Sequence, residues 1–172
     1  MKFGRGKYLN LWREMTRAQF RIRDQSSLFG FLWSLLNPLM AVGLLFAMFS
    51  TRLRSGIEFY ALYLLIGTVY YTHFSNATSG AMTVFYSMSG LTRDGIFPKD
   101  VLVLAAISTH TADFLISSLL CIAIAVFSDV TITGPIVALP LVLLLQVMLV
   151  LWVSLLLGSV YIFARDLVHI YQ

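Results

Sequence analysis

Four long apolar stretches divide the sequence, and short polar or charged segments separate them. They cover residues 28–50, 59–79, 101–127 and 135–164. None of them alternates apolar and polar residues as a half-buried strand does, and each is long enough for the helix of about 20 residues that crosses a bilayer. Because a backbone in lipid must satisfy its hydrogen bonds internally, we predict an all-α, polytopic fold with four transmembrane helices.

The segment before the first apolar stretch has a different pattern. Within residues 1–26, most apolar side chains fall on one arc of a helix at about 100° per residue. The basic residues on the opposite side repeat every four positions and are Arg13, Arg17 and Arg21. We predict an amphipathic helix in the membrane interface, with Trp12 at headgroup depth and the arginines directed to lipid phosphates or to a cytosolic partner. Phe20 and Leu9 fall off the apolar arc, so this helix is expected to have a second packing partner.

Composition and charge agree with a membrane location. The chain is 59% hydrophobic and only 12% charged, with a mean hydropathy of +0.84, whereas soluble domains carry about 25% charged residues. Seven of the twelve Lys and Arg lie in the first 23 residues, which favours a membrane surface over nucleic acid as the basic segment's partner. With a cytoplasmic N-terminus, ten of the twelve lie inside, as the positive-inside rule favours.

Few residues could carry chemistry. Cys121 is the one cysteine and cannot form a disulfide within the chain. The Gly6-Lys7 pair lacks the Ser or Thr that holds magnesium in a phosphate-binding loop. No second histidine or acid stands at metal-ligand spacing beside His73. We therefore expect neither enzyme activity nor a cofactor or metal in this chain, and ATP hydrolysis only in a partner.

The third apolar stretch contains an ionisable pair. His110 and Asp113 stand three residues apart and share a helical face near mid-membrane. Such a pair is a candidate proton relay, and the alternative is a hydrogen-bonded pair that locks two helices together. His73, in the second stretch, is interpreted as a polar residue that lines a cavity. Three nearby aromatic residues suit either a passage for sugars or simple helix packing: Tyr70, Tyr71 and Phe74.

Four local patterns together resemble the ABC type 2 permeases that export O-antigen, capsular polysaccharide and teichoic acid. The first two are the entry to the first stretch, RIRDQSSLFGFLWSLLNPLM, and the second stretch, FYALYLLIGTVYYTHFSNA. The others are the turn into the third stretch, GLTRDGIFPKDVLVL, and the end of the fourth, FARDLVHI. Their order and spacing agree with the family across the whole chain.

This resemblance implies a homodimeric permease of the inner membrane that works with two copies of a separate ABC ATPase. Residues 1–26 would be the cytoplasmic N-terminus with its interface helix, and 27–172 the transmembrane domain. The spans of both protomers would enclose a path for a lipid-linked polysaccharide or polyol, and residues 80–100 would form a coupling segment. The residues implied in ATPase coupling are Arg93, Asp94, Phe97, Pro98, Arg165 and Asp166.

The resemblance has one departure and two rivals. The family has six spans, whereas this chain ends just after the fourth predicted one, so we expect a truncated portion of a permease or a shorter relative. One rival is a proton-coupled secondary transporter that uses His110 and Asp113. The other is a membrane scaffold without transport activity that binds a cytosolic partner through its basic helix. The polymer and the direction of transport stay open.

Overall fold

The computed structural model describes residues 5–25, 32–53, 59–87, 98–128 and 137–161, and these residues form helices and no strand. The helices are α1 (Arg5–Gln25), α2 (Leu32–Leu53), α3 (Tyr60–Ser87), α5 (Lys99–Phe127) and α6 (Leu139–Tyr161). The all-α prediction is confirmed, and each apolar stretch corresponds to one helix. Helix α3 is longer than predicted, so residues 80–87 of the expected coupling segment are helical.

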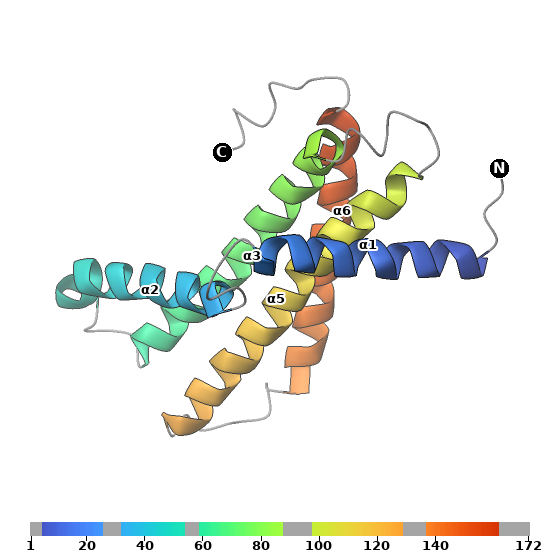
Figure 1. Ribbon diagram of the computed structural model, residues 1–172. Coiled ribbons are helices and arrows are strands. Elements are labelled where there is room, and N and C mark those ends of the chain that lie inside the picture. Colours follow the sequence, from blue (N-terminus) through green and yellow to red (C-terminus); the bar gives the residue numbers. More distant parts are fainter. Residues whose placement is uncertain (1–4, 26–31, 54–58, 88–97, 129–136, 162–172) are drawn as a thin grey trace.

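Three of the helices, α3, α5 and α6, pack along one another, and α1 lies across them (Figure 1). A core cluster joins all four elements where α1 crosses: Ala77, Ala81, Val84, Leu102, Val103, Ala106, Ile107 and Val150, with Met15 of α1 packed against it. Alanines on the facing surfaces of α3 and α5 let the two backbones approach closely. The end of α3 and the beginning of α5 therefore meet on the same side of the molecule.

Hydroxyl side chains are frequent in α3 and α5, although both helices are largely apolar. Most of these hydroxyls donate a hydrogen bond to the carbonyl four residues earlier in their own helix, which satisfies the polar group without a partner from another helix. The residues that do so are Thr68, Thr78, Thr83, Ser108, Thr109, Thr111 and Ser118. These helices can therefore bury serine and threonine in apolar surroundings at low cost.

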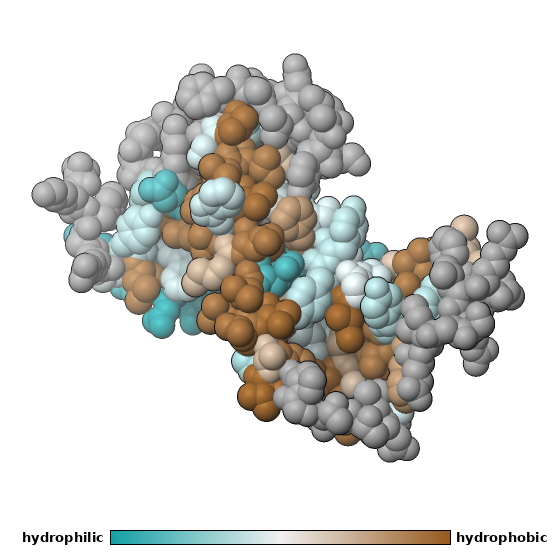
Figure 2. All heavy atoms as spheres, turned by 180° about the vertical axis from the view of Figure 1, so that it is seen from behind, coloured by the Kyte–Doolittle hydropathy of each residue, from teal (hydrophilic) through white to brown (hydrophobic). Residues whose placement is uncertain are grey.

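Helix α6 faces the bundle with a narrow stripe and exposes the rest of its apolar surface. The buried residues are Val150, Ser154 and Gly158, each four positions from the next, whereas Trp152 is 67% exposed. Brown side chains follow α6 on the rear face of the molecule (Figure 2). Helix α6 and residues Asp100–Phe127 of α5 are long and apolar enough to cross a membrane. A large exposed apolar surface marks contact with lipid or with another protein.

Helix α2 packs against the first half of α3 and runs in the opposite direction. Its Val42 joins a second core cluster with Leu65 and Val69 of α3 and with Phe114 of α5. In the view of Figure 1, α2 lies nearly level, as α1 does, and oblique to α3, α5 and α6. Its apolar part, Leu35–Met48, is shorter than a full span. The described helices thus include two clear candidate spans, and the count of four stays a prediction.

Candidate functional site

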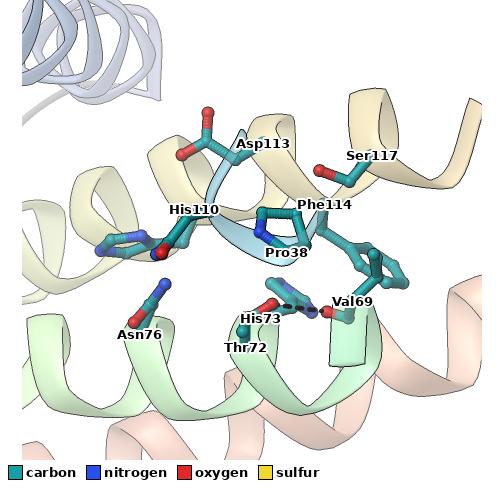
Figure 3. A pocket seen from close by; sticks show the side chains of 10 residues that line it. Pro38, Val69, Thr72, His73, Asn76, His110, Asp113, Phe114 and Ser117 are labelled. Carbon is teal, nitrogen blue, oxygen red and sulfur yellow. Dashed lines mark hydrogen bonds between the residues drawn. The ribbon is translucent and has the colours of Figure 1, made fainter. Parts of the chain in front are cut away.

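A polar cavity of about 70 Å³ lies between α2, α3 and α5 (Figure 3). Helix α3 contributes Val69, Thr72, His73 and Asn76, α5 contributes His110, Asp113, Phe114 and Ser117, and α2 contributes Asn37 and Pro38. Thr72 and His73 stand four and three residues before Asn76, and His110, Asp113 and Ser117 are spaced by three and four, so each set lies on one helical face. The prediction that His110 and Asp113 share a face is confirmed, and His73 lines the same cavity, as expected.

His73 is the most enclosed of the polar residues in this cavity, with 4% of its surface exposed. Its ring stacks on Phe114, with 4.3 Å between centroids and 10° between planes. Its Nε2 lies 3.5 Å from the hydroxyl of Thr111, at the outer limit of a hydrogen bond. Its Nδ1 has no hydrogen-bond partner among the described residues. A water needs only about 10–15 Å³, so the cavity has room for a water that satisfies Nδ1.

Gly80 sets the distance between α3 and the ring of His110. A β-carbon placed on Gly80 would lie 2.8 Å from Nε2 of His110 and 3.2 Å from its Cδ2. Both distances are shorter than ordinary contact, so His110 holds this position only because residue 80 has no side chain. By contrast, a β-carbon on Gly67, in the same helix, would meet nothing within 4 Å.

The aromatic residues proposed for a sugar passage do not share this cavity. Tyr70 makes an edge-to-face contact with Phe114, with 5.1 Å between centroids, and lines a separate apolar cavity of about 120 Å³. Tyr71 is 69% exposed, and Phe74 packs against the core cluster near α1. The structure therefore does not bring Tyr70, Tyr71 and Phe74 together, and their role in a path stays a prediction.

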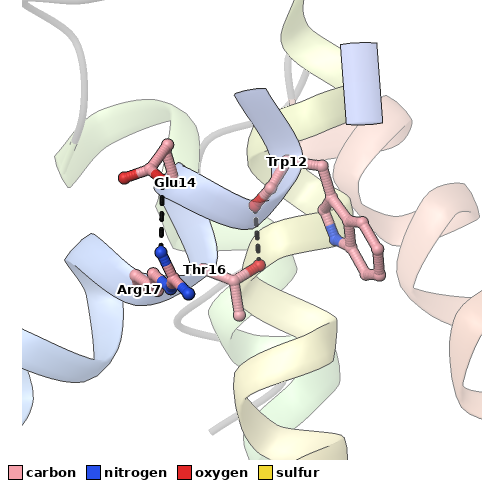
Figure 4. A network of polar contacts seen from close by, with 4 residues as sticks. All are labelled: Trp12, Glu14, Thr16 and Arg17. Carbon is pink, nitrogen blue, oxygen red and sulfur yellow. Dashed lines mark hydrogen bonds and ion pairs between the residues drawn. The ribbon is translucent and has the colours of Figure 1, made fainter. Parts of the chain in front are cut away.

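Helix α1 meets α5 through two polar contacts between side chains. The indole of Trp12 donates a hydrogen bond to Ser108 at 3.0 Å, and the hydroxyl of Thr109, which donates to the carbonyl of Ala105 at 2.9 Å, lies 3.3 Å from the amide oxygen of Gln19. The indole N–H of Trp12 is therefore bonded to α5, and the headgroup depth expected for this residue stays a prediction. On the side of α1 away from the bundle, Arg17 forms an exposed ion pair with Glu14 at 3.4 Å (Figure 4).

The three arginines predicted for a lipid or protein contact, Arg13, Arg17 and Arg21, are all exposed. Of the residues implied in ATPase coupling, only Pro98 lies within the described part, where it immediately precedes α5 with φ −67° and ψ 121°. The other five, Arg93, Asp94, Phe97, Arg165 and Asp166, lie outside the described residues. Their role stays a prediction.

Sequence reasoning missed part of the cavity. Asn37 and Ser117 were not singled out, although Ser117 stands four residues after Asp113 and seven after His110 on the same face. Within the described residues, no group of three His, Cys, Asp or Glu could hold a metal ion. The arrangement is suited to holding α2, α3 and α5 together around a small polar cavity.

Comparison with known proteins extends over nearly the whole chain. No family model matches the chain. The chain is 25% identical over 168 residues, 97% of its length, to the O-antigen export system permease protein RfbA of Klebsiella pneumoniae. A second protein of that name from the same organism is 24% identical over 97% of the chain, and one from Myxococcus xanthus is 24% identical over 95%. The chain spans 65% of the length of the Klebsiella proteins and 63% of the Myxococcus protein. These relatives confirm the resemblance to ABC type 2 permeases.

Proposed function

From the similarity to O-antigen export permeases, we propose that this chain is the membrane-spanning part of an ATP-driven exporter of a lipid-linked polysaccharide or polyol. It lies in the inner membrane with its N-terminus in the cytoplasm, forms a homodimer, and is energised by a separate ATPase. The observation that carries the proposal is the similarity over 97% of the chain to proteins named as export permeases. The exposed apolar surfaces of α5 and α6 support it.

The position of α1 supports a specific depth for the bundle in the membrane. Helix α1 meets α5 at Ser108 and Thr109, and an amphipathic helix lies at the interface. From Ser108 to the end of α5 at Phe127 the helix is about 30 Å long, and so is α3 from Tyr60 to Gly80, at about 1.5 Å per residue. Both lengths equal the hydrocarbon thickness of a typical bilayer, about 30 Å.

On this placement, α3 and α5 extend beyond the membrane on the cytoplasmic side. The extension consists of residues 81–87 of α3 and 99–107 of α5, which pack through Val84, Leu102 and Val103. Pro98 and Asp100 stand at the tip of α5, where an acid also complements the positive end of the helix dipole. We propose that this extension presents the coupling segment, with Arg93, Asp94 and Phe97, to the ATPase. Arg165 and Asp166 would provide the second contact.

Coexpression with the ATPase encoded beside this gene tests the proposal. A tagged chain should retain the ATPase through purification in mild detergent and change its rate of ATP hydrolysis. Arg93→Gln should reduce the retained ATPase at least about fivefold, because it removes a charged contact worth about 1 kcal/mol or more. Arg52→Gln, at the end of α2 that we assign to the outside, is the matched control and should have no effect.

Three outcomes contradict the proposal. One is a failure of the unaltered chain to retain the ATPase or change its hydrolysis rate. The second is an equal loss of retained ATPase in Arg93→Gln and Arg52→Gln, which would mean that charges on either side of the membrane affect ATPase binding alike. The third is labelling of cysteines introduced at Lys7 by a reagent confined to the outside of cells, in a Cys121→Ala background. That result would show that the N-terminus lies outside the cell, opposite to the proposed orientation.

A further inference from the structure

A third cavity, larger than the two already described, opens beneath α1. It is an apolar groove of about 480 Å³, within the range of about 300–1,000 Å³ of small-molecule sites. It lies between α1, α5 and α6 and is lined mainly by Leu9, Trp12, Ile107, Leu115, Val147 and Leu151. Leu9 is one of the two residues that fall off the apolar arc of α1, and it is 47% exposed. The groove therefore explains the second apolar face of α1.

The groove extends along α5 from Leu104 to Leu115, past the point where α1 crosses at Ser108. If α1 lies at the interface, the upper end of the groove is at headgroup depth. The lower end of the groove then lies about 10 Å into the hydrocarbon, at about 1.5 Å per residue. An occupant of matching chemistry is apolar below and polar at the top. An acyl chain that ends in a lipid headgroup has this form.

The charge of α1 identifies the kind of headgroup. The helix contains six Lys and Arg against two acids, Glu14 and Asp24, and Glu14 is paired with Arg17. Arg13 follows Leu9 by four residues, so the two side chains are neighbours on the helix surface. Arg13 is exposed and has no ion pair among the described residues. A cation one helical turn from a residue that lines an apolar groove suits a phosphate in an anionic lipid.

We propose that this groove binds one acyl chain of an anionic phospholipid and that Arg13 holds its phosphate. The lipid fills the space between α1 and the bundle and so fixes the interface helix against α5 and α6. The inference rests on the proposed position of α1 in the membrane and is independent of transport or of the ATPase.

Trp12 provides a direct probe, because its indole lines the groove. Trp33→Phe and Trp152→Phe would leave Trp12 as the single tryptophan. The full chain is then titrated with phosphatidylglycerol brominated on its acyl chains, and with brominated phosphatidylcholine, in otherwise unlabelled phosphatidylcholine vesicles. Quenching of Trp12 should be half-maximal at a phosphatidylglycerol fraction about fivefold lower than for phosphatidylcholine, the effect of one cation near a membrane surface.

Two pairs of variants separate the groove from general attraction. Arg13→Gln should remove the preference for phosphatidylglycerol, whereas Arg21→Gln, with the same charge change on the same helix, should keep it. Ala112→Phe, which narrows the groove from α5, should weaken quenching by either lipid. Leu119→Phe, at an exposed position of α5 outside the groove, should not. Circular dichroism must show equal helix content in each pair.

The proposal is overturned if both arginine variants behave alike, because the preference would then reflect only the overall charge of α1. It is also overturned if the lipids quench Trp12 to the same extent in Ala112→Phe as in Leu119→Phe. A third contrary result is equal quenching of Trp12 by the two lipids when the groove is unaltered. Absence of quenching by both lipids would mean that a protein segment, such as a second copy of the chain, covers the groove. The ATPase experiment is unaffected by any of these results, so the two proposals fail separately.

Discussion

Gly80 of α3 is the position where a single added methyl group tests the arrangement of the polar cavity. Its β-carbon would lie 2.8 Å from Nε2 of His110, where ordinary contact begins at 3.4 Å. The imidazole must therefore move by about 0.6 Å or α3 must separate from α5, and overpacking of this kind costs about 1–3 kcal/mol. Against this cost, replacing glycine by alanine in a helix gains up to about 1 kcal/mol.

Gly67→Ala is the matched control, because the same change in the same helix meets nothing within 4 Å. The gain in helix propensity is common to both variants, so the difference between them isolates the steric term. We expect Gly80→Ala to be less stable than Gly67→Ala by about 1–3 kcal/mol. The measurement is unfolding by sodium dodecyl sulfate in mixed micelles, followed by circular dichroism.

A double-mutant cycle with His110→Ala identifies the contact responsible. Without the imidazole, the β-carbon at position 80 has no close neighbour, so Gly80→Ala should then cost no more than Gly67→Ala. The coupling free energy should equal the steric term, about 1–3 kcal/mol. Equal stability of Gly80→Ala and Gly67→Ala, or a loss that persists without His110, would refute the close approach of α3 to this ring.

Three further predictions concern α1 and the ionisable pair. Trp12→Phe should lower the free energy of unfolding by about 1 kcal/mol through the loss of the indole's hydrogen bond to Ser108, and this contribution should be absent in a Ser108→Ala background. Burial, and secondarily the Asp100 carboxylate, raise the pKa of Tyr8 above 10.0. The resulting stability should be complete below pH 10 and fall as the pH rises toward the folded-state pKa, with Tyr8→Phe removing the dependence in unfolding measurements between about pH 9 and 11. In vesicles, a pH gradient alone should drive no substrate flux through the unaltered protein or Asp113→Asn, and gradient-driven flux that Asp113→Asn abolishes would favour the proton-coupled carrier.

Much of the fold could be predicted from the sequence, because apolar stretches and the repeat of arginines are local patterns. The bounds of α5 differ from the prediction by two residues at most, and α1 occupies Arg5–Gln25. The polar cavity could be predicted only in part. His110 and Asp113 share a face of one helix, which spacing reveals. That Asn37 of α2 meets them depends on how three helices pack, and no pattern within one helix contains that information.

The bond of Trp12 to Ser108 was missed for a related reason. The position of Trp12 on the apolar arc of α1 is a property of that helix, and it predicted a tryptophan at headgroup depth. Its partner lies 96 residues away in α5. A buried indole N–H usually finds an acceptor, so the sequence indicated that a partner was needed but did not identify it.

The length of α3 shows why a hydropathy boundary and a helix boundary are different quantities. The sequence predicted a span that ends at residue 79, whereas the helix continues to Ser87. The extra turns persist because Ala81, Met82 and Val84 are buried, with Val84 in the cluster that contains Leu102 and Val103 of α5. Protein packing can extend a helix past the lipid boundary in this way. Gly80 lies beside His110, and His110 is two residues after Ser108, where α1 crosses α5. The predicted end of the span at residue 79 therefore lies at the same level as α1, which we place at the membrane surface. On that placement, His110 and Asp113 lie about 3 and 8 Å below α1 along the α5 axis, at about 1.5 Å per residue, and thus nearer the interface than the middle of the bilayer.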